Sequence, residues 1–443
     1  MRVRHGFSSE AHPGVFESNP SLPQGMSGSR FERDFTVIRG LQFILLQRKV
    51  GFNSQKGWYR EKTSRPLQGK RFCFIYVEVI FLCIKKRVKN LYGVRKMKKV
   101  GIIGATGYTG IELMRLLYFH PRARITRVTS TSQQGEDISR VHPQFKKIYN
   151  LTLEELDIEK LAEETDIIFS ALPHGLALEK VPELIKMGKK VIDLSSDFRL
   201  KNPEDYPIWY GFEHPGPDYL EKSVYGLPEV YRDKLQDAYL VANPGCYPTS
   251  IILGLMPLIQ ENLIDCTSII CDSKSGVSGA GRGAKLPFHF PECTENFKAY
   301  RVGNHQHTPE IEQELRNISK DPALTLLFTP HLVPMIRGIL STIYAAVNKG
   351  VVKEDVEEAY QKAYQNETFI RLMDETELPE TKYVYGTNFC DIGFRLEERT
   401  GRIIVVTAID NLVKGAAGQA VQNMNILLGW PEETGLLQPV VYP

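Results

Sequence analysis

The sequence contains few cysteines, and none of them form a close pair. Seven cysteines are spread over 443 residues, an odd number with no C-x-x-C pair and no spacing typical of metal ligands. This pattern argues against a disulfide framework and a zinc site, so we expect no bound metal and a reducing, cytoplasmic environment. Internal repeats and low-complexity tracts are also absent, and 42% hydrophobic with 24% charged residues is typical of a globular chain.

Long apolar runs are missing as well. The apolar burst FCFIYVEVIFLCI, residues 72–84, is too short to span a membrane and contains Glu78. Arg2 and Arg4 are not followed by the apolar segment that a signal peptide requires. The sequence therefore predicts no membrane partner.

Positive charge is concentrated at the N-terminal end. Residues 1–96 carry 19 Lys and Arg against 6 Asp and Glu, whereas the remainder carries 36 against 46. A basic arm of this kind can bind nucleic acid, and deleting 1–96 would test that alternative. We instead interpret 1–96 as an extension that is not part of the folded enzyme, with the native start at Met97. From Met97 on, we expect no nucleic-acid partner.

Apolar strands alternate with helical segments from Met97 onward. We expect strands at 98–105, 123–130, 166–173 and 191–196, and helices at 108–121, 151–164 and 176–188. This order predicts an α/β Rossmann-type, doubly wound parallel sheet over 97–245.

The pattern changes near residue 246. Longer β-rich segments follow, and Gly401 suits a hairpin turn between the last two. We expect an α+β catalytic and oligomerisation domain with a mostly antiparallel sheet over 246–409. A small-residue helix in 410–443 would then pack back onto the first domain.

A glycine-rich turn lies between the first strand and its helix. The spacing G-x-x-G-x-x-G allows a tight turn and close approach of the backbone to a pyrophosphate, although a plain strand-to-helix turn is an alternative. The residues expected to bind a dinucleotide are Gly104, Thr106, Gly107, Tyr108, Thr109 and Gly110. The next strand ends in Ser130, Thr131 and Ser132 without an acidic residue, which favours NADP over NAD.

The stretch NPGCYPTS places Cys246 at the start of an apolar helix. Such a cysteine is either a small buried hydrophobe or a thiol nucleophile whose pKa the helix N-terminus lowers. A nucleophile needs a base, and RVGNHQHTPEIEQEL offers His305 and His307 with Glu310 to orient one of them.

Two further segments carry cations that suit an anionic ligand. Arg282 lies in the glycine-rich segment KSGVSGAGRGAK, and His331 and Arg337 flank a strand start in PHLVPMIRGIL. A flexible surface loop and a plain salt bridge are the respective alternatives.

Many blocks of the sequence together resemble one family. From Met97 to the C-terminus the chain is similar to the N-acetyl-γ-glutamyl-phosphate reductases, which belong to the aspartate-semialdehyde dehydrogenase-like group. The blocks are MKKVGIIGATGYTGIELMRLL, FSALPHG, DLSSDFRL, YGLPEVYR, NPGCYPTS, KSGVSGAGR, HQHTPEIEQEL, FTPHLVPMIRGILSTIY, GTNFCDIG and DNLVKGAAGQAVQNMN.

The resemblance implies roles for individual residues. Cys246 would be the nucleophile, and the acid/base would be His305 in first place or His307 in second, with Glu310. NADP would use the Gly104–Gly110 turn together with Ser130, Ser132, Pro173, Gly276 and Asn411. The substrate would be bound by Arg199, Arg282, His331 and Arg337. The Rossmann domain would be completed by the last helix of the chain.

The implied reaction is an NADPH-dependent reduction. N-acetyl-γ-glutamyl phosphate would be converted through a cysteine thioester to the semialdehyde and phosphate, a step of arginine biosynthesis, by a homodimer or homotetramer. Aspartate-semialdehyde dehydrogenase and aminoadipyl-phosphate reductase chemistry are alternatives. A non-catalytic NADP-sensing protein, in which Cys246 is structural, is another.

Overall fold

The computed structural model describes residues 97–374, 376–440 and 442. The interpretation of residues 1–96 as a basic extension therefore falls outside the described residues. Within the described part, no helix is both long and apolar enough to cross a membrane.

The first sheet has seven strands, all parallel, in the order β3-β2-β1-β4-β5-β7-β6. Its strands are β1 (Lys98–Ile103), β2 (Ala123–Thr129), β3 (Leu153–Glu154), β4 (Ile167–Ser170), β5 (Lys190–Asp193), β6 (Val224–Tyr225) and β7 (Leu240–Ala242). The inner strands are buried on both faces, as their continuous apolar sequences require. The predicted doubly wound parallel sheet is confirmed.

Helices follow the strands of this sheet. They are α3 (Tyr108–Tyr118), α4 (Ile138–Val141), α5 (Ile158–Glu164), α6 (Ala177–Lys186), α7 (Asp205–Trp209), α8 (Pro217–Lys222) and α9 (Pro228–Gln236), with a 3₁₀ turn η1 (Pro143–Phe145). The predicted helix over 151–164 is wrong at its start. Leu153 and Glu154 instead pair with the end of β2 as an edge strand, and the helix begins only after Asp157, whose carboxylate accepts the Lys160 N–H.

The second sheet also has seven strands, in the order β12-β13-β14-β11-β8-β10-β9. Its strands are β8 (Ile269–Ser275), β9 (Lys298–Ala299), β10 (Leu326–Leu332), β11 (Ile339–Ala346), β12 (Ile370–Leu372), β13 (Cys390–Glu397) and β14 (Arg402–Ile409). Four of the six neighbouring pairs are antiparallel, which confirms the mostly antiparallel sheet. Gly401 has a φ of 62° in the turn between β13 and β14, as a hairpin turn requires.

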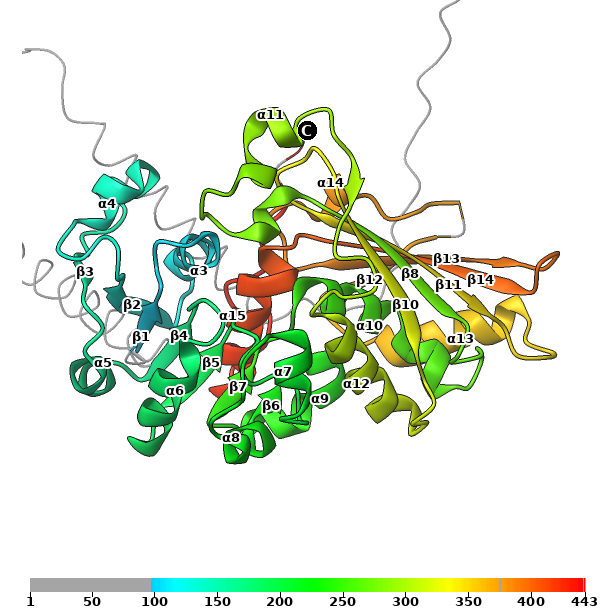
Figure 1. Ribbon diagram of the computed structural model, residues 1–443, viewed down its shortest axis with the longest axis horizontal. Helices are drawn as coiled ribbons and strands as arrows, with labels where there is room; N and C mark the ends of the chain where they lie inside the picture. Colours follow the sequence, from blue (N-terminus) through cyan, green and yellow to red (C-terminus); the bar gives the residue numbers. More distant parts are fainter. Residues whose placement is uncertain (1–96, 375, 441, 443) are drawn as a thin grey trace, which may run out of the picture. The chain divides into compact units, whose positions relative to one another are not determined.

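Helices cover one face of the second sheet (Figure 1). The helical elements of this half are α10 (Cys246–Gln260), α11 (Phe290–Cys293), α12 (Thr308–Ser319), α13 (Lys353–Tyr364), α14 (Thr381–Val384), η2 (Val277–Ala280) and η3 (Leu286–Phe288). Along β11 buried residues alternate with half-buried ones, which matches a sheet with one covered face. Helix α10 is buried over residues 247–259 and packs on β11 and β14.

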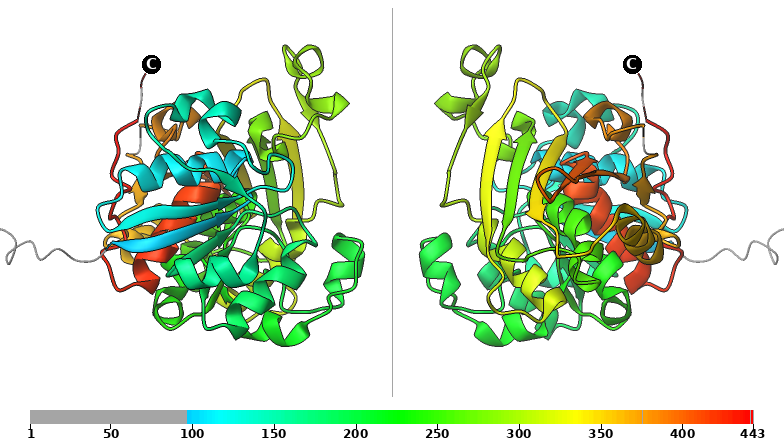
Figure 2. Two further views of the ribbon diagram at one scale, coloured as in Figure 1. Left: turned by 90° about the vertical axis from the view of Figure 1, so that its left-hand side faces the viewer. Right: turned by 90° about the vertical axis from the view of Figure 1, so that its right-hand side faces the viewer.

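The chain ends in the first domain. A π-helical turn, η4 (Val413–Ala417), leads into α15 (Gly418–Leu427), which packs against α3 and α9. Its Val421 and Met424 share one apolar core with Val100 of β1. The left-hand view of Figure 2 shows this helix in red beside the blue and cyan strands of the first sheet.

Candidate active site

Cys246 is the first residue of α10 and follows β7 after a three-residue Asn-Pro-Gly turn. Gly245 is the N-cap of this helix. Because the helix runs through the core of the second domain while β7 belongs to the first sheet, the turn carries Cys246 to the junction between the two sheets. The Cys246 side chain is partly exposed there.

Gly245 is packed tightly against two polar side chains. A Cβ atom at this position would lie 2.5 Å from Nε2 of His307 and 2.9 Å from Nη1 of Arg199. Only glycine leaves room for both groups. The structure therefore brings the predicted residues His307 and Arg199 to the turn that carries Cys246.

Glu310 organises this group from the first turn of α12. Its Oε1 accepts hydrogen bonds from the Gly245 N–H and the Tyr225 hydroxyl, both at 2.8 Å. Its Oε2 lies 3.3 Å from Arg199 Nη1, and Arg199 Nη2 also donates to the Leu194 carbonyl at 2.9 Å. Both side chains are buried, so the carboxylate and the guanidinium neutralise each other where water has little access.

His305 and His307 lie together, with ring centroids 4.8 Å apart. The His307 backbone N–H donates to Nδ1 of His305 at 3.1 Å. Burial, with a contribution from Arg301, lowers the pKa of His305 to about 3. Burial is the main reason that the pKa of His307 lies well below its usual value, and His305 and Arg199 lower it further. Both rings are therefore neutral at pH 7, and Nε2 of His307 lies beside Gly245.

The Cys246 thiol is protonated at neutral pH. Burial raises its pKa to about 11, although Arg199 and the Tyr247 N–H at the helix N-terminus act in the opposite direction. The sequence-based expectation of a thiol acidified by the helix N-terminus is therefore outweighed by desolvation. A thiolate here requires a base to remove the proton.

Polar side chains at the edge of the first domain also reach this group. His174, in the loop after β4, accepts the Ser196 N–H at Nδ1 (3.1 Å), while its Nε2 lies 3.4 Å from Nε2 of Gln306. Gln306 Oε1 accepts a 2.8 Å hydrogen bond from Arg301, whose backbone has a φ of 45°. The sequence analysis missed His174 and Arg301. His174 stands in the FSALPHG block, but no sequence signal marks the left-handed backbone of Arg301.

The glycine-rich turn between β1 and α3 is tight and closely packed. Gly104 has a φ of 80°, and a Cβ at Gly110 would lie 2.6 Å from the Gly104 carbonyl oxygen. These contacts let α3 start directly against β1, with its free N–H groups at the carboxyl edge of the sheet. The Thr106 and Ser130 hydroxyls lie 3.2 Å apart. Tyr108 is partly exposed at the helix start, and Ser132 is exposed beyond the end of β2.

Arg282 lies at this turn and not among the contacts of Cys246. Its Nη1 is 3.4 Å from the Thr106 carbonyl oxygen. Burial lowers the pKa of His142, and the charge of Arg282 lowers it further. The loop that carries Arg282 thus reaches from the second domain to the dinucleotide turn. Gly276, at the start of that loop, packs against the Ile336 backbone. A Cβ at Gly276 would lie 2.7 Å from the Ile336 carbonyl.

The remaining predicted residues have other contacts. Asn411 accepts the Gly338 N–H and donates to the Ser278 hydroxyl, and Pro173 is exposed in the loop before α6. Arg337 pairs with Glu112 at 2.7 Å and with Asp410 at 3.5 Å. His331 lies 3.0 Å from Asp272. These contacts of Arg337 and His331 match the alternative in which the segment forms a plain salt bridge. Neither side chain lies among the contacts of Cys246.

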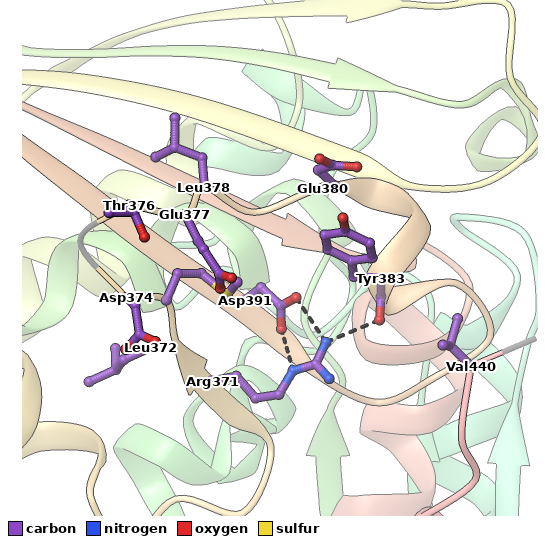
Figure 3. A pocket seen from close by; sticks show the side chains of 11 residues that line it. Arg371, Leu372, Asp374, Thr376, Glu377, Leu378, Glu380, Tyr383, Asp391 and Val440 are labelled. Atoms are coloured by element: carbon purple, nitrogen blue, oxygen red, sulfur yellow. Dashed lines mark hydrogen bonds and ion pairs between the residues drawn. The ribbon is translucent and has the colours of Figure 1, made fainter. Parts of the chain in front are cut away.

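Two cavities in the described part of the chain lie apart from Cys246. One, of about 680 Å³, is lined by residues of the 371–391 segment and Val440, with Arg371 and Asp391 paired at 2.6 Å in it (Figure 3). The other, of about 840 Å³, lies between α3, Arg337 and the C-terminal tail. Neither holds a residue of the Cys246 group. Among the described residues, no cluster of three His, Cys, Asp or Glu could hold a metal ion.

Two family models match the chain. Residues 99–238 match the model described as "Semialdehyde dehydrogenase, NAD binding domain", and residues 246–411 match "Semialdehyde dehydrogenase, dimerisation domain". Solved structures show the same fold. Aspartate semialdehyde dehydrogenase II of Vibrio cholerae complexed with ASA has a TM-score of 0.58 and 18% identity, covering 75% of this chain and 99% of its own. The Candida albicans enzyme with NADP has a TM-score of 0.56 at 17% identity, with the same coverage.

Curated relatives are much closer in sequence. The N-acetyl-gamma-glutamyl-phosphate reductase of Pelotomaculum thermopropionicum is 54% identical over 346 residues, which is 78% of this chain and 99% of the relative. That of Geobacter metallireducens is 52% identical over 348 residues, which is 78% of this chain and the whole relative. The resemblance seen in the sequence is thereby confirmed, and the chain belongs to the N-acetyl-gamma-glutamyl-phosphate reductase family of nicotinamide-dependent semialdehyde dehydrogenases.

Proposed function

We propose that this protein reduces N-acetyl-γ-glutamyl phosphate to N-acetylglutamate semialdehyde and phosphate, with NADPH as the reductant. The observation that carries the proposal is the packing of His307 Nε2 and Arg199 against Gly245, next to the Cys246 thiol. A thiol, a neutral base and a fixed cation at one helix N-terminus are the groups that acyl transfer to sulfur requires.

The first step transfers the acyl group to sulfur. His307 takes the Sγ proton of Cys246, and the thiolate attacks the acyl carbon. The bond from that carbon to the phosphate oxygen breaks, and His307 gives its proton to the departing phosphate. A thioester on Cys246 remains, which conserves the activation of the acyl phosphate. Because burial lowers the pKa of His307, its ring is neutral in the resting enzyme and has a nitrogen lone pair to receive the proton.

The second step releases the aldehyde. A dinucleotide held at the Gly104–Gly110 turn would supply a hydride to the thioester carbon. The N–H groups at the start of α10 and the Arg199 guanidinium stabilise the oxyanion that develops on the carbonyl oxygen. When the C–S bond breaks, the aldehyde leaves and Sγ regains a proton from solvent through His307. We place His307 ahead of His305 in this role, because His307 contacts Gly245 while His305 accepts a backbone N–H.

Arg301 would hold an anionic group of the substrate. Arg199 already has Glu310 as its counter-ion, whereas the exposed Arg301 donates a hydrogen bond to the neutral amide of Gln306. Burial lowers the pKa of His174, His305 and His307, and the charge of Arg301 adds to the effect in all three, so the guanidinium lies near these rings. Its left-handed backbone is the kind of local strain that persists at binding sites.

The assay that tests the function runs the reaction in reverse, as phosphate-dependent reduction of NADP⁺ with N-acetylglutamate semialdehyde. Cys246→Ala should abolish turnover and leave NADPH binding intact, whereas Cys293→Ala, at another partly exposed cysteine, should change neither. His307→Asn should lower kcat by about 10²- to 10⁴-fold, and His305→Asn by clearly less. Residual turnover in Cys246→Ala would refute the mechanism. Turnover with aspartate semialdehyde alone would move the enzyme to that alternative substrate.

The cofactor preference depends on Arg282. Its guanidinium, with the Ser130 and Thr106 hydroxyls, lies at the dinucleotide turn, and no carboxylate ends β2. A cation there favours the 2′-phosphate of NADP. Arg282→Ala should weaken NADPH binding about tenfold or more, as loss of a charge-assisted contact does, with little effect on NADH. Equal loss for both cofactors would show that Arg282 does not discriminate between them.

The second domain would also serve assembly. The family model that matches residues 246–411 is described as a dimerisation domain. We therefore propose a homo-oligomer that assembles through this domain, which sedimentation of the protein would test.

A further inference from the structure

A π-helical turn forms one wall of the Cys246 site. In η4 the Gly415 N–H donates to the Asp410 carbonyl at 3.0 Å and the Ala417 N–H to the Leu412 carbonyl at 2.9 Å, a spacing of five residues. A Cβ at Gly415 would lie 2.7 Å from Cβ of Cys246 and 3.2 Å from its Cα. The turn is therefore in direct contact with the nucleophile's own backbone. Single π turns are frequent at functional sites.

Lys414, the neighbour of Gly415, is an ammonium group sealed in the core. Its side chain and that of Glu229 on α9 are both 0% exposed, and Nζ donates to Glu229 Oε1 at 2.7 Å. Nζ also donates to Gln422 Oε1 at 2.9 Å. Neither charge has a part in the chemistry proposed above, so the pair needs another explanation.

Stability alone does not account for a buried ion pair. Removing two charges from water costs much of what their attraction returns, and apolar side chains of similar volume often stabilise a core as well or better. What a buried pair does provide is one defined geometry, because a displaced partner leaves an uncompensated charge. In this chain the defined geometry is that of η4, the turn that touches Cys246.

We propose that Lys414 is a positioning residue, and that its ion pair with Glu229 holds the η4 turn so that Gly415 fixes the direction of the Cys246 thiol. The kinetic part of this inference rests on the function proposed above. The thiol's accessibility to a small reagent tests the positioning without it.

The test uses Lys414→Met, Glu229→Met and the double variant. Each single change strands a buried charge and should lower Tm. The double change removes both charges, and Gln422 keeps Asn388 and Glu432 as partners, so Tm should return towards the wild-type value. The double variant should nevertheless lose about 10- to 100-fold in kcat, with the KM for NADPH unchanged, because a small misplacement of a reacting group has effects of that size. Iodoacetamide should alkylate Cys246 faster than in the wild type, because a loosened η4 exposes the sulfur.

A matched control is the double change Arg371→Met/Asp391→Met. This pair also has a buried carboxylate, but both residues line the cavity of Figure 3, which holds no residue of the Cys246 group. It should alter Tm and leave kcat and alkylation at the wild-type values. A Lys414/Glu229 double variant with restored Tm and wild-type kcat and alkylation would overturn the proposal.

A second variant covers the case in which the double variant does not fold. Glu229→Gln keeps an acceptor for Lys414 and removes only the counter-charge, so it should show a smaller loss of kcat with faster alkylation, and wild-type values for both would contradict the proposal. If the wild-type protein has no turnover with the acetylated substrate, the proposed function fails, while the alkylation comparison still decides the role of Lys414.

Discussion

At the residue scale, Cys246 is subject to two opposing influences. The N-terminus of α10 and Arg199 favour the thiolate, whereas burial favours the thiol and prevails. The resting site therefore holds a neutral thiol beside a neutral imidazole. A cysteine in this state should react slowly with oxidants and alkylating agents, because the thiolate is the reactive form.

The pH dependence of alkylation tests this state. With a pKa of about 11, the thiolate fraction of Cys246 in the free enzyme should rise about tenfold per pH unit between pH 7 and 9.5 without levelling off. The rate of iodoacetamide labelling of the peptide that carries Cys246, followed by mass spectrometry, should show the same rise. A plateau below pH 8 would mean that the thiolate is already formed in the resting enzyme.

The sequence could single out Cys246, His307 and Glu310, which the structure brings together, because they lie in compact blocks. Cys246 after Pro-Gly, and two histidines followed by Glu310, have a recognisable spacing. The partners of Arg337 could not be predicted, because Glu112 and Asp410 lie in segments 225 and 73 residues away. Pairings over such separations leave no local signal. Arg301 was missed for a related reason, since its position depends on a backbone conformation.

At the element scale, the glycine turn has two separate tasks. Gly110 allows α3 to begin against the backbone of Gly104 and Ala105, with would-be Cβ distances of 2.6 to 2.8 Å. At Gly107 a Cβ would meet only the Gly104 carbonyl oxygen, at 3.7 Å, so the space beside it is open. Gly110 therefore serves packing, and Gly107 leaves room for a ligand.

Alanine substitutions should separate these two tasks. Gly110→Ala forces α3 away from β1 and should cost about 1–3 kcal/mol of stability, which appears as a lower Tm. Gly107→Ala should leave Tm unchanged, since its φ of −76° suits alanine, and should weaken NADPH binding. Thermal unfolding and NADPH titration of both variants check this. Equal Tm values for Gly110→Ala and the wild type would contradict the packing role.

Element types were easier to predict than their ends. The strands of the first sheet and α10 have long apolar stretches, which allow only one assignment of secondary structure. The segment 151–164 was predicted as a single helix because charged residues dominate it, but two of its residues complete a sheet edge, which only tertiary pairing decides. The π turn before α15 was not expected either. Lys414 of this turn pairs with Glu229 of α9, 185 residues earlier, and such a distant contact leaves no local signal.

At the scale of the whole molecule, the two sheets meet around buried polar groups at the carboxyl ends of the first sheet's strands. Asp193 ends β5 and is completely buried. Its Oδ2 accepts the Ser195 hydroxyl at 2.5 Å, and its Oδ1 has no hydrogen-bond partner among the described residues. Burial raises the pKa of Asp193 to about 7, and Asp197 adds to the effect.

This carboxyl group links folding stability to pH. Its pKa in the folded protein, about 7, lies above the value of about 4 in an unfolded chain, so the folded state binds the proton more tightly. Stability from this group is complete below pH 4 and is lost as pH rises from 4 to 7, by up to about 4 kcal/mol. Asp193→Asn mimics the protonated carboxyl, so it should raise Tm most at pH 8 and clearly less at pH 5, where only about a third of this stability has been lost. The exposed Asp233→Asn, on α9, should change Tm at neither pH. Because the other groups titrate alike in all three proteins, the difference in Tm between Asp193→Asn and the wild type isolates the effect of Asp193. A difference in Tm that stays constant from pH 5 to 8 would show that Asp193 is ionised throughout that range.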